Sequence, residues 1–355
     1  MKSFAVELGE LNEYSTGDGS FSLYSKYFGE RFHNSASAFN EALNKFALPA
    51  ELERFNNGKS LNILDVCFGL GYNSAVLFEY LLDSSSSLQW WGLEMDRRPI
   101  ALALNQPSFC NLWSTAVLNR LEQINKEDGW SKKNSRGIQL WGDARMTIKT
   151  IPSTVKLDLI FHDAFSPMRC PQLWTEEFLF DLAYKLSPGG RLLTYSRSAA
   201  VRASLQRAGL KLFSITPAPG EKVRWSSGTM AVLPDEKINL DKARLRVLSL
   251  MEREHLNTRA AVPFRDPKGT DDKRTILNRR NIEQKQSKLG NTNAWHRKCH
   301  TVWYSPFVKP TGNSAFGTFV WKSTILSQSA FESVQGPDTS FSILLAKRPK
   351  VSKFF

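Results

Sequence analysis

Acidic residues at the ends of short apolar segments form the chemical pattern of this sequence. The first, Asp65, lies near the end of the run LNILDV and is followed by Gly69 and Gly71. Glycines at such a turn let the backbone approach a ligand closely. A dinucleotide-binding turn would need a third glycine where Ser74 stands, and the triplet GKS at 58–60 lacks the earlier glycine of a phosphate-binding loop. An acid followed by Gly-x-Gly is the usual shape of a site for S-adenosylmethionine, although many such turns bind nothing.

Three further acids extend this pattern. Glu94 follows the next apolar segment, 23 residues after Gly71, near the spacing of about 20 at which an acid meets ribose hydroxyls. Asp143 ends a third segment, where a carboxylate can accept from the adenine amino group, and Asp163 ends a fourth, beside the expected reacting methyl group. A single acid there often only caps the following helix. Four acids at successive ends, with Asp65 the first, favour a binding site.

A sheet whose strands end together must position these residues. Such alternation of strands and helices predicts a doubly wound α/β sheet, which binds ligands at the carboxyl ends of its strands. We expect strands at 61–66, 88–93, 138–141, 157–162 and 191–196, helices at 73–82, 97–104, 144–150, 175–186 and 199–208, and a closing antiparallel pair at 210–216 and 229–233.

Charge divides the chain unevenly. Residues 1–240 carry 26 basic and 25 acidic side chains, and the remaining 115 residues carry 21 and 9, so they hold +12 of the net charge of +13. A basic appendage is typical of a nucleic-acid-binding protein, and a solvated tail would look the same. We expect one charged helix over 241–256 and a loosely attached polar helix within 266–288, whose Arg274, Arg279 and Arg280 would contact phosphates.

The segment 157–174, LDLIFHDAFSPMRCPQLW, carries a more specific signal. It resembles the Asp-[Gly/Ala]-Phe-x-Pro…Pro-x-x-Trp signature of the methyltransferase half of MnmC and of its stand-alone relatives, called MnmD, which modify wobble uridine in tRNA. Residues 68–73 resemble the family's Phe-Gly-x-Gly-x-Asn turn, and the likeness extends over about 14–234. It implies a class I S-adenosylmethionine-dependent methyltransferase sheet with a small N-terminal segment and a basic C-terminal extension. The implied cofactor contacts are Asp65, Phe68, Gly69, Gly71, Asn73, Glu94, Gly142 and Asp143.

The resemblance implies methyl transfer to the aminomethyl nitrogen of a 5-aminomethyl(-2-thio)uridine at the tRNA wobble position. If that amine titrates like lysine, with a pKa of about 10.4, exposing its lone pair at pH 7 costs roughly 4.6 kcal/mol. Asp163 is expected to orient the amine and accept its proton, as a general base does. The expected substrate contacts are Asp18, Tyr24, Arg169, Lys222 and Arg224, of which the basic ones would hold tRNA phosphates.

Other cofactors and partners are not expected. No second Gly-x-Gly-x-x-Gly turn follows residue 234, so the flavin-dependent oxidase half of MnmC has no counterpart and we expect no flavin. The histidines share no ligand spacing, so we expect no metal. No segment approaches the roughly 18–20 apolar residues of a membrane span and no signal-peptide pattern opens the chain, which predicts a cytoplasmic protein without a membrane partner. The oligomeric state stays open.

Two alternatives remain. One is a small-molecule methyl- or aminopropyltransferase on the same fold, which would not need the basic end. The other is a catalytically inactive RNA-binding relative, against which the intact acids argue. The expected domains are an N-terminal segment packing on the core (1–56), the methyltransferase domain (57–236), a basic extension that is mostly helical or disordered (237–300) and a tail of unknown structure (301–355).

Overall fold

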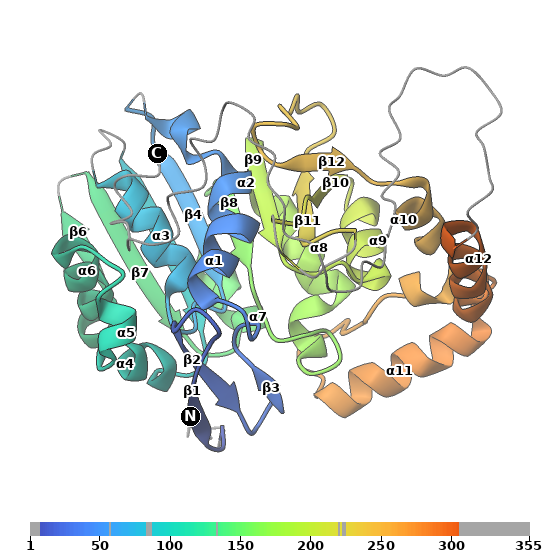
Figure 1. Ribbon diagram of the computed structural model, residues 1–355, viewed down its shortest axis with the longest axis horizontal. Helices are drawn as coiled ribbons and strands as arrows, with labels where there is room; N and C mark the ends of the chain where they lie inside the picture. The colour runs from blue at the N-terminus through green and yellow to red at the C-terminus, as the bar shows by residue number, and fades with distance from the viewer. Residues whose placement is uncertain are drawn as a thin grey trace, which may run out of the picture.

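A nine-stranded sheet forms the centre of the molecule (Figure 1). The computed structural model describes residues 8–304, apart from 57, 83–86, 133, 219–220 and 222–224. The strands run in the order β12-β10-β11-β9-β8-β4-β5-β7-β6. The five central ones are parallel, which confirms the doubly wound α/β sheet: β4 (Leu61–Val66), β5 (Leu88–Glu94), β7 (Ser135–Trp141), β8 (Leu157–His162) and β9 (Leu186–Thr194).

Antiparallel strands complete both edges of this sheet. The pair β10 (Lys211–Ile215) and β11 (Gly228–Val232) forms as expected and joins β9 through β11. Two edge strands were not expected from the sequence, β6 (Gly129–Lys132) beside β7 and β12 (Leu245–Val247) beside β10. Both are short, and short segments carry little periodic signal.

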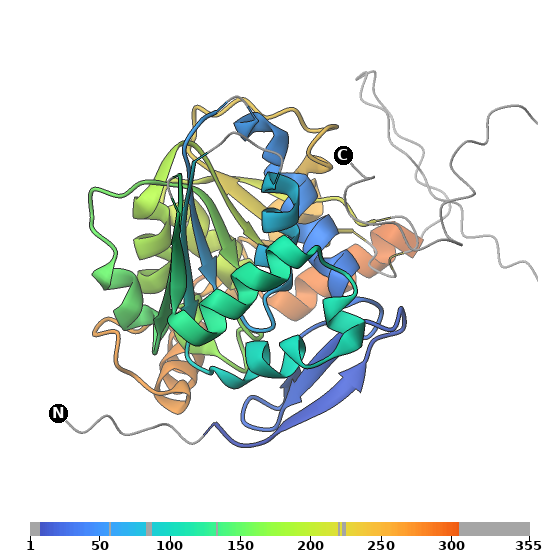
Figure 2. The same ribbon diagram turned by 90° about the vertical axis from the view of Figure 1, so that its left-hand side faces the viewer.

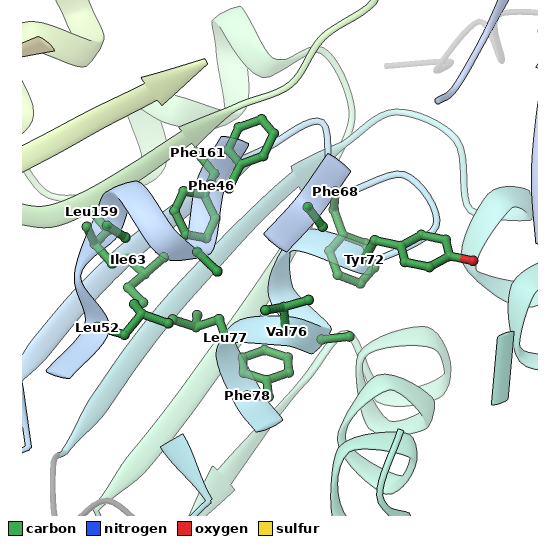
Figure 3. Packing of buried hydrophobic residues seen from close by; sticks show 14 of the residues in the cluster. Phe46, Leu52, Ile63, Phe68, Tyr72, Val76, Leu77, Phe78, Leu159 and Phe161 are labelled. Carbon is green, nitrogen blue, oxygen red and sulfur yellow. The ribbon is translucent and has the colours of Figure 1, made fainter. Parts of the chain in front are cut away.

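Helices cover both faces of the sheet, as Figure 2 shows. Alternate residues of β4 enter different cores, Ile63 the first and Leu64 the second, because successive side chains of a strand point to opposite faces. Figure 3 shows part of the first core, where the rings of Phe46 and Phe161 lie 5.6 Å apart. The first core includes residues of α3 (Tyr72–Leu81) and α6 (Thr115–Glu127), and the second includes residues of α8 (Glu176–Lys185) and α9 (Ala199–Arg207).

The remaining segments connect these layers. The shorter helices are α1 (Ala38–Ala42), α2 (Leu48–Ala50), α4 (Arg98–Leu104), α5 (Pro107–Cys110) and α7 (Ala144–Thr147), with a π-helical turn at Leu43–Ala47 and 3-10 turns at Leu52–Phe55, Ile148–Thr150, Pro171–Trp174 and Arg259–Ala261. Within the described ranges, no helix is both long and apolar enough to cross a membrane.

A small antiparallel sheet precedes the core. It consists of β1 (Leu11–Ser15), β2 (Phe21–Ser25) and β3 (Glu30–Arg31), and it lies at the lower end of the large sheet in both views (Figures 1 and 2). The Glu30 carboxylate accepts hydrogen bonds from the backbone amide and the hydroxyl of Ser166, at 2.8 and 2.9 Å. This contact ties the small sheet to the loop that follows β8.

The prediction of one charged helix over 241–256 is wrong. The segment divides into β12 and α10 (Leu250–His255). Leu245 pairs with Ile215 and Val247 with Phe213, so this stretch extends the sheet. Ser249 is the N-cap of α10 and forms a capping box with Glu252.

The helix expected within 266–288 exists as α11 (Lys273–Gln286), but it is not loosely attached. Ile276 is fully buried in the second core. The guanidinium groups of Arg279 and Arg280 donate to the carbonyl groups of Arg265 and Val262, and Arg280 also lies over the ring of Phe264. The sequence did not indicate this attachment, because Arg279 and Arg280, which make part of it, are charged residues. Among the described residues, the final helix is α12 (Thr292–Tyr304).

Candidate active site

A cavity of about 730 Å³ lies at the carboxyl ends of the parallel strands, within the range of about 300–1,000 Å³ of small-molecule sites. Five of the residues predicted from the sequence line it: Gly69, Glu94, Gly142, Asp143 and Asp163. They lie at or just after the carboxyl ends of β4, β5, β7 and β8, four adjacent strands of the sheet. The sheet therefore gathers residues that lie far apart in the chain.

Glu94 is held by the glycine turn that it faces. Its Oε2 accepts from the Gly69 amide at 3.0 Å, and its Oε1 accepts from the amides of Met95 and Asp96 at 2.7 and 3.0 Å. Gly69 has φ of 54°, in the left-handed region that favours glycine. Burial raises the pKa of Glu94 above its ordinary value, while the three amide hydrogen bonds oppose the shift. The carboxylate is thus oriented at the cavity wall as a fixed acceptor.

Asp143 has two local partners. It caps α7 through a hydrogen bond of 2.9 Å from the Arg145 amide to its Oδ1, and its Oδ2 accepts from the Arg145 guanidinium at 2.6 Å. The capping role weighed in the sequence analysis is therefore present. Asp143 also lines the cavity.

Asp163 lies on the cavity wall directly after β8. Its Oδ2 accepts from the Asn73 side chain at 2.9 Å, so Asn73 acts on the site through Asp163 and not from the wall itself. Burial raises the pKa of Asp163 to about 7, the Glu41 carboxylate adds to the shift, and the Asn73 hydrogen bond opposes it. The carboxyl group is therefore divided between its two protonation states near neutral pH.

The same wall contains a buried ion pair that no sequence motif predicted. Glu41 and Lys45 line the cavity, and the Lys45 ammonium lies 2.5 Å from Glu41 Oε1. Although burial opposes it, the Lys45 charge lowers the pKa of Glu41, so Glu41 is ionised. Only the tertiary structure brings this pair beside Asp163.

Three predicted cofactor contacts lie behind the cavity wall. Asp65 is fully buried and accepts from the Ser74 hydroxyl at 2.5 Å, which holds the start of α3 against β4. Phe68 and Gly71 pack together, since a side chain at position 71 would place its Cβ 2.9 Å from the Phe68 ring. Gly71 also has φ of 88° at the N-cap of α3. These residues shape the turn from behind.

None of the three predicted substrate contacts that the structure describes lines the cavity. The Asp18 carboxylate accepts from the hydroxyls of Thr16, Ser20 and Ser37 in a turn of the small sheet. Tyr24 in β2 and Arg169 on the surface of the loop after β8 do not line the cavity either. Lys222 and Arg224 lie outside the described residues.

The C-terminal extension contributes part of the cavity wall, which the sequence analysis missed. Thr270, Asp271 and Asp272 line it. Asp266 holds their turn, because its Oδ1 accepts from the amides of Thr270 and Asp271 at 3.1 Å and its Oδ2 accepts from Arg145 at 2.6 Å. Asp-Pro-Lys-Gly at 266–269 is a turn sequence that could have indicated this loop.

Replacing Asp266 with Asn is expected to weaken binding of the predicted cofactor by about 1–3 kcal/mol, the cost of unpairing a buried polar group. An amide at this position would set an NH₂ group against either the Arg145 guanidinium or the loop amides. Calorimetric titration measures the affinity, and the thermal midpoint reports whether the variant is folded. The matched control is Asp235→Asn at an exposed position. Equal affinity in the two variants would show that the loop does not support the cavity.

Known proteins are similar to this chain in sequence and in fold. Residues 108–231 match the family described as S-adenosyl-L-methionine-dependent methyltransferase. An uncharacterized protein of Methanocaldococcus jannaschii is 30% identical over 200 residues, which cover 55% of this chain and 52% of that protein. The tRNA 5-methylaminomethyl-2-thiouridine biosynthesis bifunctional protein MnmC of Nitrosospira multiformis is 24% identical over 210 residues, which cover 55% of this chain and 33% of MnmC.

The crystal structure of MNMC2 from Aquifex aeolicus is 28% identical, with a TM-score of 0.64 over 79% of this chain and 87% of that chain. The chain spans about half the length of the Methanocaldococcus protein and a third of the Nitrosospira MnmC. The sequence resemblance to the methyltransferase half of MnmC is thereby confirmed. The chain is therefore similar to S-adenosyl-L-methionine-dependent methyltransferases, and among them to MnmC and MNMC2.

Proposed function

We propose that this chain transfers a methyl group from S-adenosylmethionine to the aminomethyl nitrogen of a 5-aminomethyl(-2-thio)uridine at the tRNA wobble position. The observation that carries the proposal is the Asp163 carboxyl group in one cavity with Glu94 and Gly69, on the segment that carries the resemblance to MnmC. The name of the MnmC relatives supplies the substrate class. The proposed partner is therefore tRNA, and the proposed location is the cytoplasm.

The cavity wall suits the cofactor. S-adenosylmethionine supplies an electrophilic methyl group when bound. Glu94 would accept from the ribose hydroxyls and Asp143 from the adenine amino group, because carboxylates are acceptors and these ligand groups are donors. Apolar side chains on the same wall would contact the adenine ring, among them Leu93, Ala144 and Leu173.

Asp163 would orient the amine and take its proton. A base with a pKa near the working pH accepts a proton and is still sufficiently ionised to do so, and the pKa of Asp163 is raised to about 7. Asn73 fixes Oδ2, so we assign Oδ1 as the atom that receives the proton.

The loop after β8 would keep this end of the cavity in position. The Tyr195 hydroxyl donates to the Ala164 carbonyl at 2.8 Å, and the Trp174 indole donates to the Phe165 carbonyl at 2.7 Å. Phe165 also stacks on Phe28, with ring centroids 4.4 Å apart. A rigid, apolar surround favours catalysis by positioning the two reactants.

Mass analysis of wobble nucleosides tests the function. Cells lacking this protein are expected to accumulate the unmethylated aminomethyl nucleoside and to lose its methylated form. The wild-type chain should restore the modification, and Asp163→Asn should not. Unchanged nucleosides in the deletion strain would refute the tRNA substrate. Methylation or aminopropylation of small amines by the purified protein without RNA would instead favour the small-molecule alternative.

A further inference from the structure

A second, more open hollow of about 560 Å³ adjoins the cavity and shares Tyr27, Gln172 and Asp272 with it. Its other lining residues come from α11: Lys273, Arg274, Leu277, Asn278 and Asn281. We propose that this hollow, here called the α11 groove, binds the single-stranded RNA that flanks the target nucleotide. The proposal rests on the proposed function and specifies which surface holds the rest of the substrate.

The groove continues directly from the cavity wall. Asp272 lines both hollows and caps α11 through a hydrogen bond of 2.7 Å from the Thr275 amide. The next residue, Lys273, already belongs to the groove. From Lys273 to Asn281 the helix rises roughly 12 Å, at 1.5 Å per residue. An extended strand that leaves the cavity would therefore run beside α11 from Lys273 to Asn281.

The charge of the groove suits phosphates. In the part of the chain that the structure describes, Lys273 and Arg274 form no salt bridge, although Arg274 helps to lower the pKa of Asp272. Arg279 and Arg280, by contrast, are used within the fold by backbone carbonyl groups. This corrects the sequence expectation that treated Arg274, Arg279 and Arg280 alike, because only Arg274 is left to meet a phosphate.

Tyr27 offers a surface on which a base can stack. Its side chain is 52% exposed at the boundary between the two hollows. The Tyr27 ring packs edge-to-face against Phe28, with ring centroids 4.9 Å apart, and Phe28 in turn stacks on Phe165. These two contacts hold the Tyr27 ring in place. Aromatic side chains beside basic ones are the usual means of binding unpaired nucleotides. The amide groups of Gln172, Asn278 and Asn281 add donors and acceptors for base edges.

The test uses the full chain and a fluorescent anticodon stem-loop RNA with an aminomethyluridine at the wobble position. Lys273→Gln/Arg274→Gln is expected to weaken binding about tenfold at low salt and to flatten the log–log salt dependence by about 0.7 per lost phosphate contact. Tyr27→Ala is expected to weaken binding about fivefold or more without changing that slope. The matched control, Lys132→Gln/Arg136→Gln, removes two exposed charges from the far edge of the sheet.

The outcomes separate the groove from the function. If the wild-type chain binds and methylates the stem-loop while the groove variants behave like the control, the groove is wrong and the function stands. If the wild-type chain neither binds nor methylates it, the proposed function fails and with it the occupant of the groove. If the duplex stem alone competes as well as the stem-loop, the occupant is not single-stranded, which also overturns the proposal. Thermal midpoints and cofactor affinity equal to wild type show that the variants are folded.

Discussion

Replacing Asp163 with Asn is expected to slow methyl transfer by about a hundredfold or more, the usual contribution of a general base. Asparagine keeps the shape of the side chain and can still accept from Asn73, but it cannot take the proton. Single-turnover rates at saturating tRNA and cofactor measure the loss. A nearly intact rate would make Asp163 structural. A fall in cofactor affinity as large as the fall in rate would make binding its main role.

The same carboxyl group sets the expected pH dependence. Because burial raises the pKa of Asp163 to about 7, the rate should rise as the pH passes through that value and the group loses its proton. The Glu41 charge contributes to the shift, so Glu41→Gln should make ionisation easier and move the rise to lower pH. Glu122→Gln removes an exposed charge on α6 and serves as the control. A rise that does not move in Glu41→Gln would contradict the assignment to Asp163.

Replacing Glu94 with Ala is expected to weaken S-adenosylmethionine binding by about 1.5–3 kcal/mol, the range for hydrogen bonds to charged groups. The ribose hydroxyls would lose their acceptor, and so would the Gly69 amide that the carboxylate orients. Calorimetry measures the affinity, and neither nicotinamide nor flavin cofactors should bind.

Glu94→Gln separates the two parts of this loss, because its single amide oxygen can still accept from the turn. Affinity should fall in both variants, and less steeply in Glu94→Gln. If Glu94→Ala binds the cofactor as tightly as the wild type does, the ribose assignment is wrong. A lower thermal midpoint only in Glu94→Ala would indicate that the turn itself has loosened.

The sequence by itself determined the central sheet and where its strands end. The bounds of β4 (Leu61–Val66) and β8 (Leu157–His162) agree with the predicted ranges. Strands that helices cover on both faces consist of consecutive apolar residues, and such runs can be recognised in the sequence. A polar residue after such a run marks the ligand-binding edge. For this reason Glu94, Asp143 and Asp163 could be found from the sequence, and the structure places all three at one cavity.

The tertiary structure alone decided what each polar side chain does. Asp65 shares the pattern of the other acids, yet it faces Ser74 behind the wall. It pairs with Gly92 and Phe161, so it lies two residues deeper in the sheet than Glu94 and Asp163 do. The Arg145–Asp266 contact joins residues 121 positions apart and makes the extension part of the cavity. The sequence alone predicts that Arg280 is a free charge, but its guanidinium donates to a backbone carbonyl. Local patterns record burial and chain direction, but a distant partner exists only once the chain has folded.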